Sequence, residues 1–184
     1  MKKIILASAS PRRKQLLEQA EIDFEIVVSE TDESFPSDMP IEEVPVHIAL
    51  QKAKAVADLV DTNSIIIAAD TIVVVDDEII GKPKDENDAI AILQKLNGKT
   101  HRVITGVCIV KDGKEILITD ITLVTFHQLS LEQLTHYVQH YKPYDKAGAY
   151  AIQEWIGVVG IKKIDGCFYN VMGLPVSKVL AHLS

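Results

Sequence analysis

The sequence is poor in the residues that mark secreted and membrane-spanning proteins. It contains two cysteines, Cys108 and Cys167, which lie far apart and form no CxxC pair. This pattern argues against a disulfide framework and favours a reducing compartment, so we expect a cytoplasmic protein. No apolar stretch approaches the roughly 18 residues that a membrane-spanning helix needs. The apolar run before Ser8 ends too early for a signal peptide, so we expect no membrane partner.

Motifs of several common enzyme classes are missing as well. Without GxxxxGK[ST] a P-loop nucleotidase is disfavoured, and without GxGxxG after a strand dinucleotide binding has no support. No serine lies in GxSxG and neither cysteine has an evident base, which leaves covalent catalysis with little support. His136 and His140 have the spacing of a zinc pair, but no glutamate follows His136. We interpret them as part of a solvated helix face.

Basic residues are outnumbered by acidic ones. The 19 Lys and Arg stand against 26 Asp and Glu, which gives a formal net charge of −7. A field of this sign repels nucleic acid and anionic membranes, so a polyphosphate ligand would need a local cluster of cations. The 184 residues, with a hydrophobic fraction of 47%, are enough for one large domain or two closely packed lobes.

Strand-like and helix-like segments alternate along the chain, which is typical of α/β proteins. The patterns predict strands at 3–7, 24–28, 65–69, 71–75, 79–80, 103–110, 115–126 and 158–164. They predict helices from Pro11 onward and at 41–60, 85–96, 131–141 and 170–183, the last one broken near Gly173, and an ordered loop at 143–154. Ser10 and Asp85 are the expected N-caps, and Asp112-Gly113 is the expected hairpin turn.

The segment from Ser8 to Arg13 joins the first predicted strand to the first predicted helix. Such a junction directs backbone N–H groups and the positive end of the helix dipole toward the end of the strand. Arg12 and Arg13 would add fork-shaped donors suited to phosphate oxygens. The segment therefore predicts a phosphate site, and a capped helix with two solvated arginines is the alternative that the pattern leaves open.

Asp70 follows the apolar strand 65–69 directly. A carboxylate at that position costs several kcal/mol unless it is paired or bound to a metal. Glu33, in the acidic loop 29–40, is a further carboxylate, and Mg²⁺ uses paired carboxylates when it also holds substrate phosphates. A purely structural aspartate is the competing interpretation.

Two lysines complete a set of charges that could cleave a polyphosphate. Lys52 lies on the predicted helix 41–60, and Lys82 follows a glycine in a loop. Each alone would be interpreted as a surface lysine. Together with Asp70 and the arginines they provide what metal-assisted cleavage of a phosphoanhydride needs: cations for the phosphates and carboxylates for the metal. The residues alone point no further than this class of reaction.

An ordered series of short motifs resembles the Maf family. The motifs are Ser8-Ala9-Ser10-Pro11-Arg12-Arg13, Ala69-Asp70-Thr71, Gly81-Lys82-Pro83, Thr105-Gly106-Val107, Asp145-Lys146-Ala147-Gly148-Ala149-Tyr150 with Ile152-Gln153, and Gly166-Cys167-Phe168-Tyr169-Asn170-Val171 with Gly173-Leu174-Pro175. Each motif alone is weak. The complete set, in this order along nearly the whole chain, is highly specific.

The resemblance implies a fold and a reaction. The fold is an α/β structure with a mixed twisted sheet in two lobes around a central cleft, similar to the inosine triphosphate pyrophosphatases, and residues 1–184 would form one such domain. The reaction is that of a nucleoside triphosphate pyrophosphatase, in which water attacks the α-phosphate to give the nucleoside monophosphate and pyrophosphate. The resemblance also implies a divalent cation, Mg²⁺ or Mn²⁺, and a homodimer.

The resemblance assigns roles by motif match. Phosphate-binding positions are Ser8, Arg12 and Arg13; metal and catalytic positions are Glu33, Lys52, Asp70 and Lys82; and Gln153 is a substrate position. Within these roles Asp70 and Glu33 are the expected metal ligands. Asp70 is also the family's proposed proton acceptor, and whether it acts as ligand or base stays open.

Thr71, with Arg13 and Gln153, resembles the branch of the family that acts on dTTP and UTP, whereas the 7-methyl-GTP branch tends to carry glutamine after the aspartate. The segment 140–144 departs from the usual Ser-Gly-Glu-Pro-like turn. The order of preference among UTP, dTTP and modified pyrimidine nucleotides therefore stays open. A second function class also stays open, a non-enzymatic nucleotide- or nucleic-acid-binding regulator of cell division, although the net charge of −7 argues against nucleic acid as a partner.

The remaining conspicuous residues have structural interpretations. We expect Gly148 and Gly173 to permit backbone turns or close packing, and Asn170 to satisfy buried backbone groups. Trp155, the single tryptophan, is interpreted as a packing anchor rather than a platform for a base.

Overall fold

The computed structural model describes residues 2–183. Over these residues the strands form a seven-stranded mixed sheet in the order β2-β1-β3-β5-β6-β7, with β4 paired to β3. The chain divides into two compact units. The first holds the residues up to Thr71, Thr105–Asp120 and those from Gly173 onward; the second holds Ile72–Ile104 and Ile121–Met172. The expected α/β class with a mixed sheet is confirmed.

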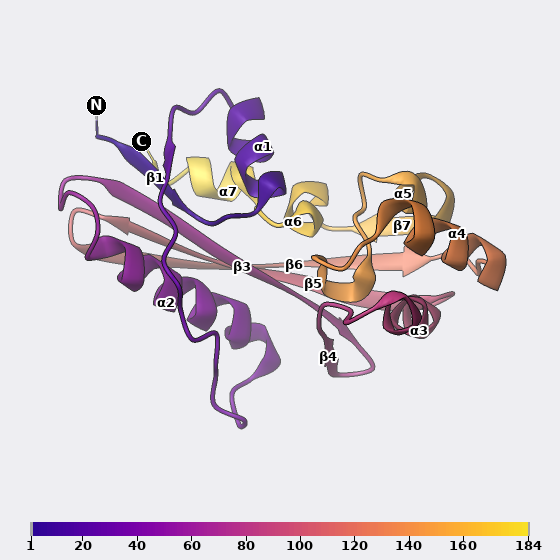
Figure 1. Cartoon of the computed structure of the whole chain (residues 1–184). Helices are drawn as coiled ribbons and strands as arrows, with labels where there is room; N and C mark the ends of the chain where they lie inside the picture. Colours follow the sequence, from indigo (N-terminus) through magenta and orange to yellow (C-terminus); the bar gives the residue numbers. More distant parts are fainter. Residues whose placement is uncertain (1, 184) are drawn as a thin grey trace. The chain divides into compact units, whose positions relative to one another are not determined.

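The first unit is built on parallel strand pairs joined by helices. Its elements are β1 (Ile4–Ala7), α1 (Pro11–Gln19), β2 (Glu25–Ile26), the 3-10 helix η1 (Ile41–Glu43), α2 (Val44–Ala57) and α7 (Val176–Leu180), with parts of β3 (Ile65–Val75), β5 (Thr100–Lys111) and β6 (Lys114–Phe126). Strand β1 pairs in parallel with both β2 and β3, which is why a helix lies in each connection. Figure 1 shows α2 on one face of these strands and α1 and α7 on the other.

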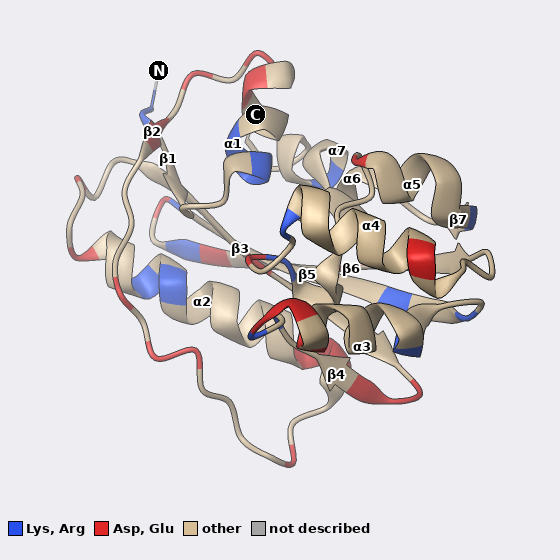
Figure 2. Ribbon diagram, turned by 45° about the vertical axis from the view of Figure 1, so that its right-hand side comes forward, with Lys and Arg blue, Asp and Glu red and all other residues tan. Residues whose placement is uncertain are grey.

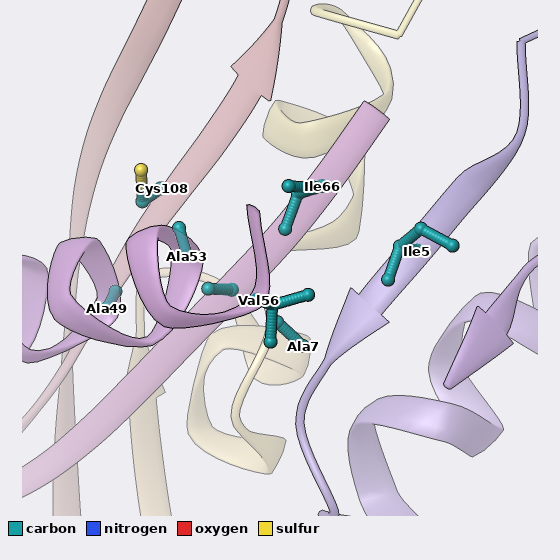
Figure 3. Packing of buried hydrophobic residues seen from close by; sticks show 8 residues of the cluster. Ile5, Ala7, Ala49, Ala53, Val56, Ile66 and Cys108 are labelled. Carbon is teal, nitrogen blue, oxygen red and sulfur yellow. The ribbon is translucent and has the colours of Figure 1, made fainter. Parts of the chain in front are cut away.

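Small and β-branched side chains fill the space between α2 and the strands (Figure 3). The buried cluster comprises Ile5, Ala7, Ala49, Ala53, Val56, Ile66, Ala68 and Cys108. The strand residues alternate by two and the helix residues recur at three to four positions, so each element presents one apolar face. At the start of α2 the approach is closest, because a Cβ on Gly106 would lie 2.0 Å from the backbone nitrogen of Val46. Alanine and glycine thus bring α2 directly onto the sheet.

The second unit combines antiparallel strands with short helices. Its elements are β4 (Glu78–Ile80), α3 (Glu86–Leu96), α4 (Leu131–Tyr141), the 3-10 helix η2 (Ala147–Ala149), α5 (Trp155–Gly160), β7 (Ile161–Asp165) and α6 (Phe168–Met172), with the remaining parts of β3, β5 and β6. Strand β4 pairs antiparallel with β3, and β7 with β6. Helix α3 contacts both α4 and η2.

Local signals in the sequence placed most element boundaries well. The Asp85 side chain accepts a hydrogen bond from the backbone nitrogen of Asp88 at 2.9 Å, which is the expected N-cap of α3. Asp112 and Gly113 have φ of 54° and 71°, as the expected hairpin turn requires. Ser10 lies at the N-cap position of α1, but its side chain makes no capping bond.

Three expected segments differ from the structure. Strand β3 runs without interruption through Asp70, because that side chain is paired with a lysine and has no need to leave the sheet. The expected strand 158–164 begins only at Ile161, because the residues before it continue α5. Ile156 and Gly160, four positions apart, are the buried residues of that helix. The second expected strand, 24–28, shortens to β2. No helix within residues 2–183 is both long and apolar enough to span a membrane.

Candidate active site

Two carboxylates in the first unit share one lysine. The Lys52 Nζ atom, from α2, lies 2.8 Å from Oδ1 of Asp70 on β3 and 2.8 Å from Oε1 of Glu33 in the acidic loop. The side chains of Lys52 and Asp70 are 17% and 16% exposed, whereas that of Glu33 is 54% exposed. A partly buried ammonium between two carboxylates offsets their mutual repulsion. The structure therefore brings together three of the charged residues that the sequence predicted as catalytic.

The loop that carries Glu33 is tied to α2. Gln51 donates through Nε2 to the backbone oxygen of Ser34 at 3.2 Å, and the same atom lies 3.1 Å from Nε2 of His47. Within the loop, the Asp32 carboxylate accepts from the backbone nitrogen of Ser34 at 3.2 Å and from its hydroxyl at 3.0 Å. Gln51 and Lys52 are consecutive on the helix, so one turn of α2 holds both the loop and its carboxylate.

Arg13 is a buried hub of the first unit, with 8% of its surface exposed. It donates through Nε to the Gly173 backbone oxygen at 2.7 Å, through Nη1 to the Ser8 hydroxyl at 3.0 Å and through Nη2 to the Thr71 hydroxyl at 3.0 Å. Burial lowers the pKa of the Arg13 guanidinium, an effect that the nearby Asp70 carboxylate opposes.

Hydroxyl groups extend this hub across the strands. The Thr71 hydroxyl lies 2.9 Å from that of Thr105, which is fully buried on β5. On the other side, Ser8 also accepts from the backbone nitrogen of Ser10 at 3.3 Å, which shapes the turn into α1. The turn between β1 and α1 is therefore fixed by side-chain hydrogen bonds that reach two neighbouring strands.

The basic residues of the site come from α1 and α2, and both helices carry basic positions in Figure 2. Arg12 occupies the first turn of α1 and is half-buried, which places a cation at the N-terminal end of a nine-residue helix. The helix dipole makes this end favourable for anions, and a guanidinium strengthens the effect. Chemically, the turn from Ser8 to Arg13 can receive phosphate oxygens beside the carboxylates of Asp70 and Glu33.

Two predicted site residues belong to the second unit. Lys82 is exposed in the loop after β4, and Gln153 is exposed just before α5. The structure thus brings seven predicted residues together in the first unit and places the other two in the second. The seven are Ser8, Arg12, Arg13, Glu33, Lys52, Asp70 and Thr71.

Sequence reasoning missed Thr105, Gln51 and the backbone oxygen of Gly173 as parts of the site. Thr105 and Gly173 belong to motifs of the family series, but nothing in a motif shows that Arg13 reaches a residue 160 positions away. Gly173 has a φ of 114°, so its expected role in a turn is confirmed. Gln51 lies next to Lys52, and only the fold shows that it holds the acidic loop.

The donor set fits a metal ion that arrives with its substrate. Among residues 2–183 no three His, Cys, Asp or Glu side chains gather as a ready-made metal site. Asp70 and Glu33 supply two carboxylates. Mg²⁺ keeps several waters and is commonly held by one or two carboxylates together with substrate phosphates. Asp70 and Glu33 are therefore the residues that could hold such an ion.

Comparison with known proteins places this geometry in a family context. The family model described as "Maf-like protein" matches residues 3–184. The dTTP/UTP pyrophosphatase of Cytophaga hutchinsonii is 52% identical over 181 residues, which cover 98% of this chain and 82% of that protein. The dTTP/UTP pyrophosphatase of Phocaeicola vulgatus is 47% identical over 182 residues, covering 98% of this chain and 94% of that protein. The dTTP/UTP pyrophosphatase of Flavobacterium psychrophilum is 46% identical over 181 residues, covering 98% and 93%.

A solved structure is also similar, though more distantly. A nucleoside-triphosphatase, a dITP/XTP pyrophosphatase from Mycobacterium abscessus, aligns at 16% identity and a TM-score of 0.40 over 67% of this chain and 72% of that chain.

Proposed function

This chain belongs to the Maf-like family, and on that basis we propose that it is a nucleoside triphosphate pyrophosphatase acting on dTTP and UTP. The reaction hydrolyses the α–β phosphoanhydride to the nucleoside monophosphate and pyrophosphate. Near full-length similarity to proteins named for this activity supports the substrate class. The observation that carries the chemistry is the cluster of Asp70, Lys52 and Glu33 next to the phosphate-binding turn.

In the first unit, cationic and polar residues are assigned to the phosphates and a carboxylate is assigned to the attacking water. Ser8 and Arg12 bind phosphate oxygens at the start of α1, and Arg13 holds the shape of that turn from inside. Asp70 orients or deprotonates the attacking water, since a carboxylate in hydrogen-bond reach of water can act as a general base. Lys52 keeps Asp70 and Glu33 in place, and it offsets negative charge as the bond to the leaving pyrophosphate breaks.

Residues from the second unit are proposed to serve the same reaction. Lys82 would add a cation for the phosphates, and Gln153 would recognise the nucleobase. Thr71, with Arg13 and Gln153, is the combination that supports pyrimidine triphosphates as substrates. Modified pyrimidine nucleotides are included in the proposal.

A divalent cation, Mg²⁺ or Mn²⁺, is part of the proposal, with Asp70 and Glu33 as its ligands from the protein. When bound it would neutralise phosphate charge and polarise the phosphoryl group. Lys52 provides positive charge between the same two carboxylates.

The direct test is the Asp70→Asn variant assayed with UTP and dTTP in the presence of Mg²⁺. Asparagine cannot accept the proton and is a weaker metal ligand, so pyrophosphate release should fall by about 10²–10⁴-fold. The matched control is Asp120→Asn, which breaks the pair formed by Asp120 with Lys178 at 2.8 Å in the same unit. Full activity in Asp70→Asn would refute the role of Asp70. Release of orthophosphate alone would refute cleavage at the α–β bond.

The proposed function also includes an oligomeric state and a cellular compartment. We propose a homodimer on the strength of the family resemblance, and sedimentation analysis tests it. Cys108 and Cys167 are both free thiols, which supports a reducing compartment and hence the cytoplasm.

A further inference from the structure

One hydroxyl in the second unit ties the chain on both sides of Gln153. Tyr137, on α4, is fully buried. Its hydroxyl accepts a hydrogen bond from the backbone nitrogen of Ala151 at 3.1 Å and donates one to Oε2 of Glu154. Gln153 lies between these two anchored residues and is exposed. One side chain thus contacts both ends of the short stretch from which Gln153 projects.

Two further contacts hold residues at either end of the same segment, Tyr150 and Glu154. The Glu154 Oε1 atom lies 3.7 Å from Nζ of Lys146, a lysine that is only 9% exposed. The hydroxyl of Tyr150 lies 2.7 Å from Nε2 of His101, in a buried pair. The backbone nitrogen of Glu154 also donates to the Ala151 oxygen at 3.1 Å, which closes a turn around Gln153. Tyr137 is the side chain that ties this turn to α4.

Both carboxylate oxygens of Glu154 take part in these contacts, which we call the Tyr137 clamp: the hydroxyl of Tyr137 with Ala151 and Glu154, and Glu154 with Lys146. Glu154 occupies the N-cap position of α5, yet its side chain makes no capping hydrogen bond to that helix. Its two oxygens instead face Tyr137 and Lys146. Behind the segment, a Cβ on Gly157 would lie 1.7 Å from the Ile152 backbone oxygen, so the first turn of α5 lies directly on the segment. Helices α4 and α5 lie side by side in Figure 1.

We propose that Tyr137 is a positioning residue for nucleobase selection: by holding Ala151 and Glu154 it fixes Gln153 against the edge of the base. This inference rests on the proposed function. A glutamine amide presents one donor and one acceptor, which match the O4 and N3–H of uracil or thymine. The same amide, rotated by a half-turn, matches cytosine. Discrimination between these bases therefore requires that Gln153 be placed where only one orientation of its amide can be accommodated, and Tyr137 holds the backbone from which that side chain projects.

The test is Tyr137→Phe, which keeps the buried ring and removes both hydrogen bonds of the hydroxyl. The kcat/KM ratio of UTP to CTP should fall by about tenfold, because small displacements of a recognition group strongly reduce its effect. The change should arise from the KM for UTP, with kcat at saturating UTP within about twofold of the wild type because the proposed chemistry lies elsewhere. Hydrogen exchange at the Ala151 amide, followed by NMR, should accelerate as that amide loses its acceptor.

The matched control is Tyr141→Phe on the same helix. The Tyr141 ring stacks on that of Tyr137 with centroids 5.0 Å apart, but it is 38% exposed. This variant should leave both the selectivity ratio and the Ala151 exchange unchanged. If Tyr137→Phe does not fold, Glu154→Gln removes the charge from the clamp while keeping an acceptor, and its selectivity ratio should fall severalfold.

The outcomes separate this inference from the proposed function. Wild-type protein that releases no pyrophosphate from any nucleotide refutes the proposed function, and the inference with it. An active wild type with an unchanged UTP to CTP ratio in folded Tyr137→Phe, or in Glu154→Gln, refutes the inference alone. A selectivity ratio that falls equally in Tyr141→Phe also refutes it, since the effect would then come from packing of the helix.

Discussion

Arg13 donates through three different nitrogens, and every one of these acceptors belongs to the protein. Such an arginine acts mainly by shaping its surroundings, because a planar guanidinium joins groups that no other side chain could reach together. Ser8, Thr71 and Gly173 are the groups that it joins. The turn from Ser8 to Arg13 therefore depends on a residue that is itself almost inaccessible to solvent.

Replacement of Arg13 by lysine should reveal this role as a loss of stability. A single ammonium cannot reach all three acceptors, and each buried group left without its partner costs about 1–3 kcal/mol. We expect Arg13→Lys to lower the free energy of unfolding by at least about 2 kcal/mol in urea titrations. Arg12→Lys, on the half-buried neighbour, should change it by less than about 0.5 kcal/mol. Equal free energies of unfolding for the two variants would contradict the structural role of Arg13.

His101 provides a prediction about pH. It is 1% exposed, its Nδ1 atom has no hydrogen-bond partner among residues 2–183, and burial lowers its pKa to about 4. The folded protein thus keeps His101 neutral while the unfolded chain takes up a proton near pH 6.5. Because the unfolded state binds more protons in this window, stability should fall as the pH drops from 6.5 toward 4, by about 3 kcal/mol in all.

The measurement is the free energy of unfolding across that pH range, compared between the wild type and His101→Gln. Glutamine does not titrate and can still bond to Tyr150, so its stability should depend less steeply on pH. Identical slopes in the two proteins would show that His101 does not titrate as the structure implies.

Among the secondary-structure elements, α2 does most to form the site, since it carries Lys52 and Gln51. Its start is set by Gly106, where a Cβ would lie 2.0 Å from the Val46 nitrogen and 2.3 Å from the Pro45 carbonyl carbon. Both of these atoms belong to the backbone, so relief requires a shift of the helix itself. The position of Lys52 thus depends on the absence of a side chain at Gly106 on β5.

Gly106→Ala should therefore destabilise the protein by about 3 kcal/mol and lower its activity together with its stability. The control is Gly81→Ala, because a Cβ there would meet nothing within 4 Å. That variant should change the free energy of unfolding by less than about 1 kcal/mol in thermal and urea denaturation. A tolerated Gly106→Ala would mean that α2 can move away from the sheet at little cost.

The elements themselves were largely predictable from local chemistry, and the exceptions have physical causes. Asp85 and Asp112-Gly113 marked boundaries because caps and turns depend on a few neighbouring residues. The start of α5 was not predictable, because apolar β-branched residues before Ile161 fit a strand as well as a short buried helix. Asp70 seemed to interrupt β3 only because its partner Lys52 lies 18 positions earlier and on another element.

The candidate site was predictable to the extent that its residues lie in motifs. Asp70 and the turn at Ser8 could be identified from the chemistry of their neighbours in sequence. The hydrogen bond between the hydroxyls of Thr71 and Thr105 could not, because these residues are 34 positions apart and lie on different strands. Tyr137 carried no signal at all, since a buried tyrosine on an amphipathic helix looks like any other core residue.

At the scale of the whole molecule, the excess of acidic residues and the cations of the turn from Ser8 to Arg13 act on different ligands. A net charge of −7 opposes long polyanions, while Arg12 and the start of α1 attract a short one. Part of the acidic excess, at Asp70 and Glu33, is internally neutralised by Lys52. This distribution of charge favours a single nucleotide over a nucleic acid as the ligand, which stays a prediction.

We accordingly expect no shift of duplex DNA in gel electrophoresis at about 0.15 M salt, since nucleic-acid binding relies on many phosphate contacts by cations. Nucleotide turnover should be retained under the same conditions. A salt-dependent DNA shift in protein that turns over no triphosphate would instead favour the regulator of cell division that binds without catalysis.

The bond from Arg13 to the Gly173 oxygen also bears on how the protein is made. The arginine leaves the ribosome early, and its partner 160 residues later. Until Gly173 emerges, a nascent chain contains every proposed phosphate-binding side chain but cannot complete the buried hub that shapes their turn. The buried hub therefore cannot be completed during translation before Gly173 has been made.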